Sequence, residues 1–236
     1  MSAWAPRRFW TEARAEPAPG GYTVTLDGRS VKTPAKAALV VPTLALAEAI
    51  AAEWQAQEQV VDPQAMPFTR SANSAIDKVA PQFAEVAEIV AAYGDSDLLC
   101  YRAEAPASLV AQQAAAWDPL LAWSAEVLGA PLATRAGIRH ESQPADSLAA
   151  LARAVGAQSP FELTALHDLV ALSGSLVIGL AAQRAAWPAE ALWQASRIDE
   201  TFQRALWGRD EEAEAAEAAA RAAFLHAARF HALCLA

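Results

Sequence analysis

One short β region near the start of the chain, followed by helical periodicity, limits the fold more than any other feature of the sequence. Between residues 22 and 26, apolar residues alternate with threonines, a period of two that is typical of a half-buried strand. Asp27-Gly28 is a favoured two-residue hairpin turn, so we expect residues 29–33 to return as a strand and residues 38–41 to add another. The fold class that follows is α+β, with a small β-rich N-terminal part and a larger, mainly α-helical C-terminal part.

The expected division is a β-rich domain with one helix over residues 1–70 and a helical domain over residues 71–236. Residues 1–20 are rich in proline and glycine and predict a polar arm. Thr43 is expected to cap a helix over residues 44–59.

In the second part, a capping box over residues 159–162 predicts a helix that continues to about residue 186. Asp210 begins a last helix, which Phe224 and Phe230 are expected to anchor and which can pack over Trp193 and Trp207.

Composition and charge exclude several classes of protein. The chain has 236 residues, of which 54% are hydrophobic and 19% charged, so a sizeable core is expected and disorder is not. The formal net charge is −9 and no long basic cluster occurs, which argues against nucleic-acid binding. An acidic protein can attract a basic partner, but charge alone does not identify one.

The cysteines and the hydropathy pattern predict a cytoplasmic protein that does not insert into a membrane. Cys100 and Cys234 lie in apolar surroundings, which favours a reducing compartment. The first residues lack the apolar segment of a secretory signal and the long Arg/Ser-rich stretch of an organelle presequence. The longest apolar run, residues 169–182, is too short to span a bilayer.

Residues 191–208 are expected to form one helix with two unlike faces. At about 100° per residue, one face carries an ordinary apolar stripe that can dock on a core. Its members are Ala191, Ala195, Ile198, Phe202, Ala205 and Leu206, with Asp199 at the margin. The opposite face places Glu200 between two arginines with a tryptophan at each end, and comprises Trp193, Arg197, Glu200, Arg204 and Trp207.

This second face has two explanations. Indole and guanidinium groups are enriched at protein–protein hot spots, so the face can bind a partner. Alternatively, a neighbouring helix covers the tryptophans and the arginines extend past them to solvent.

No motif for catalysis, metal binding or nucleotide binding is present. The four histidines and two cysteines lack metal-ligand spacing, and no phosphate-binding glycine pattern or nucleophile elbow occurs. Asp95 and Asp97 could form an acid/base pair, but they flank Gly94 and are better explained as caps. His167 and Asp168 diverge as helix neighbours. We therefore expect no catalytic residues, no metal and no cofactor.

Several short stretches, in order along nearly the whole chain, resemble one family. They are Arg8-Phe9-Trp10, Leu26-Asp27-Gly28-Arg29 with Thr33-Pro34, Glu53-Trp54 with Gln57, Met66-Pro67 with Thr69, Asp97-Leu98-Leu99-Cys100-Tyr101-Arg102, Trp117-Asp118-Pro119 with Trp123, and Asp199-Glu200 with Gln203 and Trp207-Gly208. The sequence resembles the F1-ATPase assembly chaperone family that attends the alpha subunit of ATP synthase, in its bacterial, alphaproteobacterial form.

This resemblance implies a chaperone without enzymatic activity. The implied client is the free alpha subunit, which such a chaperone protects from aggregation until the beta subunit replaces it. The family's acidic position falls on Glu200, and we expect the partner-binding residues to be Glu200, Asp199, Trp193, Arg197, Arg204 and Trp207. The protein is expected to be a monomer. Residues 130–158 match the family poorly, and no function is assigned to them.

Two other functions stay open on the sequence alone. The chain can be a small cytoplasmic enzyme with an inter-domain cleft that uses Asp95, Asp97 or His167. It can also be a structural subunit of a stable complex.

Overall fold

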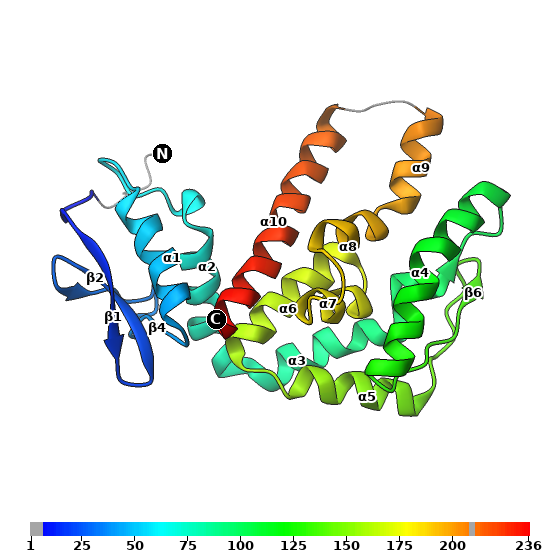
Figure 1. Cartoon of the computed structure of the whole chain (residues 1–236), viewed down its shortest axis with the longest axis horizontal. Helices are drawn as coiled ribbons and strands as arrows, with labels where there is room; N and C mark the ends of the chain where they lie inside the picture. The colour runs from blue at the N-terminus through cyan, green and yellow to red at the C-terminus, as the bar shows by residue number, and fades with distance from the viewer. Residues whose placement is uncertain (1–6, 208–210) are drawn as a thin grey trace. The chain divides into compact units, whose positions relative to one another are not determined.

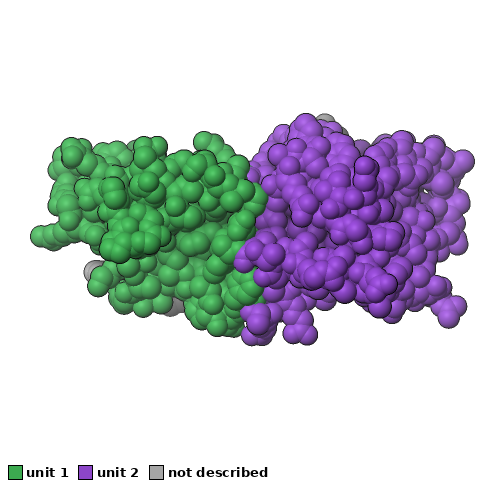
Figure 2. Space-filling view, turned by 60° about the horizontal axis from the view of Figure 1, so that its bottom comes forward, with its two compact units in different colours: residues 1–83, 159–165, 229–236 green, residues 84–158, 166–228 purple. Residues whose placement is uncertain are grey.

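The computed structural model describes residues 7–207 and 211–236, which group into two compact units (Figure 2). Unit 1 comprises Met1–Phe83, Ser159–Ala165 and Arg229–Ala236, and unit 2 comprises Ala84–Gln158 and Leu166–Ala228. The two units are defined by contacts within the folded chain and not by independent folding. The domain boundary expected near residue 70 therefore stays a prediction.

Unit 1 holds a small antiparallel sheet, as the sequence predicts. Its strands are β1 (Ala13–Ala18), β2 (Gly21–Leu26), β3 (Arg29–Ser30) and β4 (Val40–Val41), and β2 pairs with each of the others (Figure 1). The turn residues Asp27 and Gly28 have φ values of 48° and 78°. Two consecutive positive φ values are what a tight hairpin with the twist of its strands requires.

Strand β1 was not expected, because residues 1–20 predict only a polar arm. Its sequence, ARAEPA, has no β-branched residue and contains a proline. The strand forms by backbone pairing with β2, from Ala13 opposite Leu26 to Ala18 opposite Gly21. Proline is tolerated there because β1 is at the edge of the sheet. The Asp27 carboxylate also accepts hydrogen bonds from the backbone N–H groups of Thr11 and Glu12, at 3.0 and 2.9 Å.

Two helices of unit 1, α1 (Leu44–Gln55) and α2 (Pro67–Ser74), have side-chain caps of different origin. Thr43 caps α1 as predicted, accepting from the N–H of Leu46. Met66 at the N-cap of α2 has no side-chain oxygen, and Glu53 of α1 takes over its role. The Glu53 carboxylate accepts from the N–H groups of Phe68 and Thr69, at 2.6 and 2.8 Å. Helices α1 and α2 are thereby tied together.

The core of unit 1 is completed by segments from late in the chain. Helices α6 (Pro160–Ser173) and α10 (Glu211–Leu235) supply Ala165, Phe230 and Cys234, which pack with Leu46 and Ile50. The capping box of α6 forms as predicted, with reciprocal bonds between Ser159 and Glu162.

Unit 2 is almost entirely helical, which together with the sheet of unit 1 confirms the α+β class. Its remaining helices are α3 (Phe83–Ala92), α4 (Ala107–Val127), α5 (Ala145–Gly156), α7 (Leu176–Gln183), α8 (Ala189–Ser196) and α9 (Ile198–Trp207). Strands β5 (Tyr101–Arg102) and β6 (Arg135–Ala136) form a parallel pair.

Short irregular helices complete the described chain. They are η1 (Pro63–Ala65), η2 (Ala75–Val79, a π turn), η3 (Ala80–Gln82), η4 (Tyr93–Ser96) and η5 (Leu98–Cys100). Among the described residues, we find no helix that is both long and apolar enough to cross a membrane.

The single helix expected over residues 160–186 is wrong, because Gly174 divides it into α6 and α7. Gly174 has a φ of 75°, the left-handed conformation that ends helices. Ser175 then caps α7 by accepting from the N–H of Ile178. Gly179 fits closely against α6, where an added Cβ would lie 2.7 Å from a methyl group of Val170. The two glycines therefore act differently, one as a helix stop and one as a packing contact.

Candidate functional site

The stretch that the sequence singles out is not one helix, so this part of the prediction is wrong. Helix α8 ends at Ser196, and Arg197 has φ −114° and ψ 19° before α9 begins. The Ser196 hydroxyl donates to the carbonyl oxygen of Trp193 at 2.7 Å, a local bond that competes with helical pairing. The two helices therefore do not share the faces that a continuous helix would give them.

Trp193 lies in the core of unit 2 and not on its surface. Its side chain is only 2% exposed, and its ring lies 5.6 Å from that of Phe224 in α10. The expectation that the last helix packs over Trp193 is confirmed. The Trp193 ring lies beneath the exposed residues of this stretch. The observed arrangement therefore matches the alternative in which a neighbouring helix covers the tryptophan.

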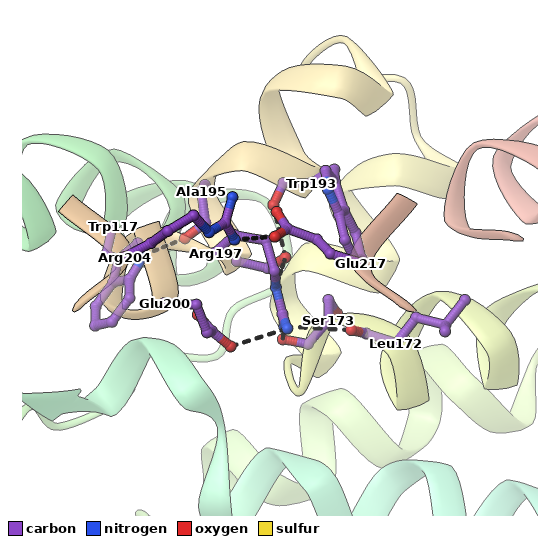
Figure 3. Close-up of polar contacts among 10 residues, drawn as sticks. Trp117, Leu172, Ser173, Trp193, Ala195, Arg197, Glu200, Arg204 and Glu217 are labelled. Atoms are coloured by element: carbon purple, nitrogen blue, oxygen red, sulfur yellow. Dashed lines mark hydrogen bonds and ion pairs between the residues drawn. The ribbon is translucent and has the colours of Figure 1, made fainter. Parts of the chain in front are cut away.

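Arg197 links α6, α8 and α9 (Figure 3). Its guanidinium lies over the Trp193 ring at 4.9 Å and donates to the carbonyl oxygens of Leu172 and Ser173, at 3.3 and 3.4 Å. Those carbonyls belong to the last turn of α6, where no further helical N–H is available to them. The same guanidinium pairs with Glu200 at 2.9 Å.

Glu200 is the exposed acidic group of this site. Its side chain is 50% exposed, and Arg197 holds the carboxylate in place from one side. Asp199 points elsewhere, accepting a hydrogen bond from the Gln113 side chain of α4 at 2.6 Å. Glu200 is therefore oriented by the protein and still open to a partner.

Arg204 lies one turn from Glu200 on α9, but its guanidinium is engaged by another residue. It pairs with Glu217 of α10, and this ion pair joins α9 to α10 (Figure 3). The side chain of Trp207 and residues 208–210, including the expected helix stop and cap at Gly208 and Asp210, lie outside the described residues.

The apolar stripe of this stretch faces solvent along part of its length. Ile198 packs against the core of unit 2, but Phe202 is only half-buried and Leu206 is 65% exposed. The expectation that the whole stripe docks on the core is wrong for its second half. Sequence periodicity identifies an apolar face but carries no information on how far the neighbouring core extends.

Of the two acidic residues considered for catalysis, Asp97 caps a helix as expected, whereas the expectation of a cap is wrong for Asp95, which lies inside η4. Asp97 is fully buried and accepts from the N–H groups of Leu99 and Val177, both at 3.0 Å, so its expected capping role is confirmed. Burial raises its pKa to about 6. Asp95 accepts from the N–H of Gln143 at 2.7 Å and pairs with His140 at 3.2 Å.

The remaining titratable candidates give no constellation for chemistry. The imidazole of His167 is half-exposed and hydrogen-bonded to the carboxylate of Asp168 at 3.1 Å, so the expectation that these two neighbours diverge is wrong. This bond raises the pKa of the imidazole. Burial raises the thiol pKa of both Cys100 and Cys234 to about 12, so both thiols are protonated and unreactive. Within residues 7–207 and 211–236, no group of three or more His, Cys, Asp or Glu side chains could hold a metal ion.

Comparisons with known proteins agree on one family. The family model described as ATP12 chaperone protein matches residues 7–125. The structure of Atp12 from Paracoccus denitrificans is 52% identical with a TM-score of 0.94, covering 97% of this chain and 98% of that one. A point mutant of P. denitrificans Atp12p is 51% identical with a TM-score of 0.95, over 99% of this chain and 100% of that one. A candidate chaperone from Agrobacterium tumefaciens is 39% identical with a TM-score of 0.89, over 97% and 85%.

Proposed function

This chain belongs to the ATP12 chaperone family, and from that premise we propose that it is an assembly chaperone of the ATP synthase F1 sector that binds the free alpha subunit. The match at 51% identity over 99% of the chain carries this proposal. Membership in a chaperone family implies a protein client rather than a substrate to be turned over.

The partner surface that we assign lies on α9. It combines the exposed Glu200 on one side of this short helix with Phe202 and Leu206, a half-buried and an exposed apolar side chain, on the other side. Such a mixture suits a chaperone, because apolar contacts hold an aggregation-prone client while charged groups keep the free protein soluble. Asp199, Arg204 and Trp207 complete the set of proposed partner-binding residues.

Trp193 and Arg197 have supporting roles at this surface. The buried Trp193 ring and the last carbonyls of α6 fix the Arg197 guanidinium, which in turn fixes the Glu200 carboxylate. A carboxylate that is already oriented loses less side-chain entropy when it meets a basic group of the client. The protein acts in the cytoplasm and is a monomer before it meets the client.

A binding experiment with two forms of the client tests this function. The purified chain is mixed with isolated alpha subunit and, separately, with assembled F1, and complexes are separated by size. We expect capture of the isolated subunit, suppression of its aggregation in light scattering, and no capture of assembled F1. A permanent stoichiometric complex with assembled F1 would instead identify a structural subunit, and turnover of a substrate would identify an enzyme.

A further inference from the structure

A small apolar socket lies between α4 and α8 in unit 2. It has a volume of about 240 Å³ and is lined by Ala115, Ala116 and Pro119 of α4 and by Trp187, Ala191 and Ala195 at α8, among others. Ala115 and Ala191 are exposed, so the socket opens to solvent. Alanine side chains on both helices leave a depression where larger side chains would fill the gap.

The two ends of the socket are closed in different ways. At one end, the Trp187 ring meets that of Trp123 edge-on, with ring centroids 6.0 Å apart. At the other end, Asp199 lies four residues beyond Ala195 and accepts the hydrogen bond from Gln113, one turn before Ala116. A bounded depression of this kind can hold an inserted group in one position.

The size of the socket suits a single side chain. Sites for cofactors and drug-sized ligands typically occupy about 300–1,000 Å³, more than is available here. An apolar cavity of about 150 Å³ is enough to hold a benzene ring. An aliphatic or aromatic side chain of a partner therefore fits, and its burial against Trp187 has the character of an interface anchor.

Charge at the ends of the socket indicates what accompanies that side chain. The lining residues are uncharged. Glu126 is exposed and lies seven residues beyond Pro119, two turns along the same face of α4. Asp199 and the exposed Glu200 are at the opposite end. The Arg197 guanidinium, which is bonded to Glu200, also donates to the end of α6. A partner segment with lysine or arginine near its apolar residue complements this pattern.

We propose that this socket receives a bulky apolar side chain of the client, from a segment that also carries a basic residue within a few positions. The inference rests on the proposed function, because it takes the client to be the alpha subunit. It extends the partner surface from α9 to the α4/α8 side of unit 2, where Ala195 lines the socket four residues before Asp199 of α9.

Substitution at the mouth of the socket tests the proposal. Ala191→Glu places a charged, longer side chain at an exposed position, and should weaken capture of isolated alpha subunit about tenfold or more. The matched control is Ala149→Glu, an exposed alanine in α5 of the same unit, which should leave capture within twofold of the parent. Circular dichroism and melting temperature verify that both variants are folded. Trp187→Ala, which removes one wall, should weaken capture in the same direction.

A peptide array identifies the chemistry of the occupant. Overlapping peptides covering the alpha subunit are probed with the parent and with the Ala191→Glu variant. Peptides that bind the parent but not the variant should carry Leu, Ile, Met or Phe within about one helical turn of Lys or Arg. Their binding should weaken as the salt concentration rises.

The outcomes separate this inference from the function on which it rests. If the parent captures alpha subunit and Ala191→Glu captures it equally well, the socket proposal is overturned and the chaperone function stands. If the parent does not capture alpha subunit, both are overturned. A concentration-dependent dimer of the parent that Ala191→Glu abolishes would show that a second copy of the chain fills the socket, which also overturns the proposal.

Discussion

A single carboxylate, Glu200, is the residue on which the proposed partner surface depends most. It is half-exposed, and the Arg197 that holds it is itself fixed by α6 and by the Trp193 ring. Glu200→Lys would place an ammonium beside Arg197. Like charges one turn apart cost only a few tenths of a kcal/mol, too little to unfold the chain.

We therefore expect Glu200→Lys to abolish capture of alpha subunit without unfolding the protein. Reversing a charge that becomes desolvated at an interface costs about 2 kcal/mol or more in binding. Circular dichroism and melting should stay near those of the parent, while aggregation of the client resumes in light scattering. Glu88→Lys, at an exposed position of α3, is the charge-matched control. Undiminished capture by Glu200→Lys would remove α9 from the client surface.

Trp54 illustrates a residue whose loss should act through stability instead. It packs on the core of unit 1, with its ring 5.3 Å from that of Trp10. The Trp54 ring is partly buried, so its loss costs less than the roughly 3–5 kcal/mol of a fully buried aromatic side chain, and an unpaired cation in its place adds to that cost. Trp54→Arg should therefore be largely insoluble, whereas Trp54→Phe, which keeps a ring, should remain soluble. A soluble arginine variant with the parent's melting temperature would contradict this assignment.

At the scale of helices and strands, Asp97 joins elements far apart in the chain. Its carboxylate accepts from Leu99 in η5 and from Val177 in the first turn of α7. Burial raises the pKa of this carboxyl from 3.8 to about 6 in the folded protein. The folded state then holds a proton that the unfolded chain has released, so the contribution of Asp97 to stability falls as pH rises from about 4 to about 6.

Comparison with Asp97→Asn isolates this effect, because asparagine does not titrate. Both proteins are unfolded with urea at several pH values. The stability advantage of the parent over the variant should shrink by up to about 3 kcal/mol between pH 4 and pH 6, the linkage value of a carboxyl whose pKa rises from 3.8 to about 6 on folding. An advantage that does not change across this range would mean that the Asp97 carboxyl titrates normally.

The sequence predicts an element well where its signal is local. The Asp27-Gly28 hairpin, the Thr43 cap and the capping box at Ser159 each depend on a few neighbouring residues, and all three form. It fails where the deciding contact is distant. Strand β1 forms through pairing with β2, and the break at Arg197 coincides with hydrogen bonds from its side chain to the end of α6.

The candidate site, too, has features that the sequence predicts and features that depend on distant contacts. Glu200 could be singled out from helical spacing and family resemblance, and the structure places its side chain in an exposed position. The packing of the last helix over Trp193 could also be predicted, but the pairing of Arg204 with Glu217 of α10 lies beyond the reach of local periodicity. The socket at Trp187 depends on how α4 meets α8, and no local pattern marks it.

At the scale of the whole molecule, unit 1 needs residues 229–236 to complete its core. Phe230 and Cys234 are buried there, and the carbonyl of Leu233 accepts a hydrogen bond from Thr43 at the start of α1. Deleting residues 229–236 should lower the free energy of unfolding of unit 1 by about 3–5 kcal/mol or more. This is the loss that is typical of removing one buried phenylalanine side chain.

Amide hydrogen exchange of β2 and α1 at increasing urea concentration measures this effect, because both elements lie in unit 1. The deletion should move the loss of their protection to lower urea concentration. Leu235→Ala, at a side chain that is 64% exposed, should leave the transition within about 0.5 kcal/mol of the parent. An unchanged transition after deletion would mean that residues 7–83 and 159–165 carry a sufficient core without residues 229–236.

Unit 1 is built from segments far apart in the sequence, so its core can be completed only late in translation. Its sheet and first helices lie within residues 1–83, but the core residues at 229–236 are translated about 146 residues later. At about 5–20 residues per second, that interval lasts roughly 7–30 s. During this time the nascent apolar face around Leu46 and Ile50 lacks Phe230, its partner from α10. Until residues 229–236 have been translated, this member of a chaperone family therefore carries an uncovered apolar surface of its own.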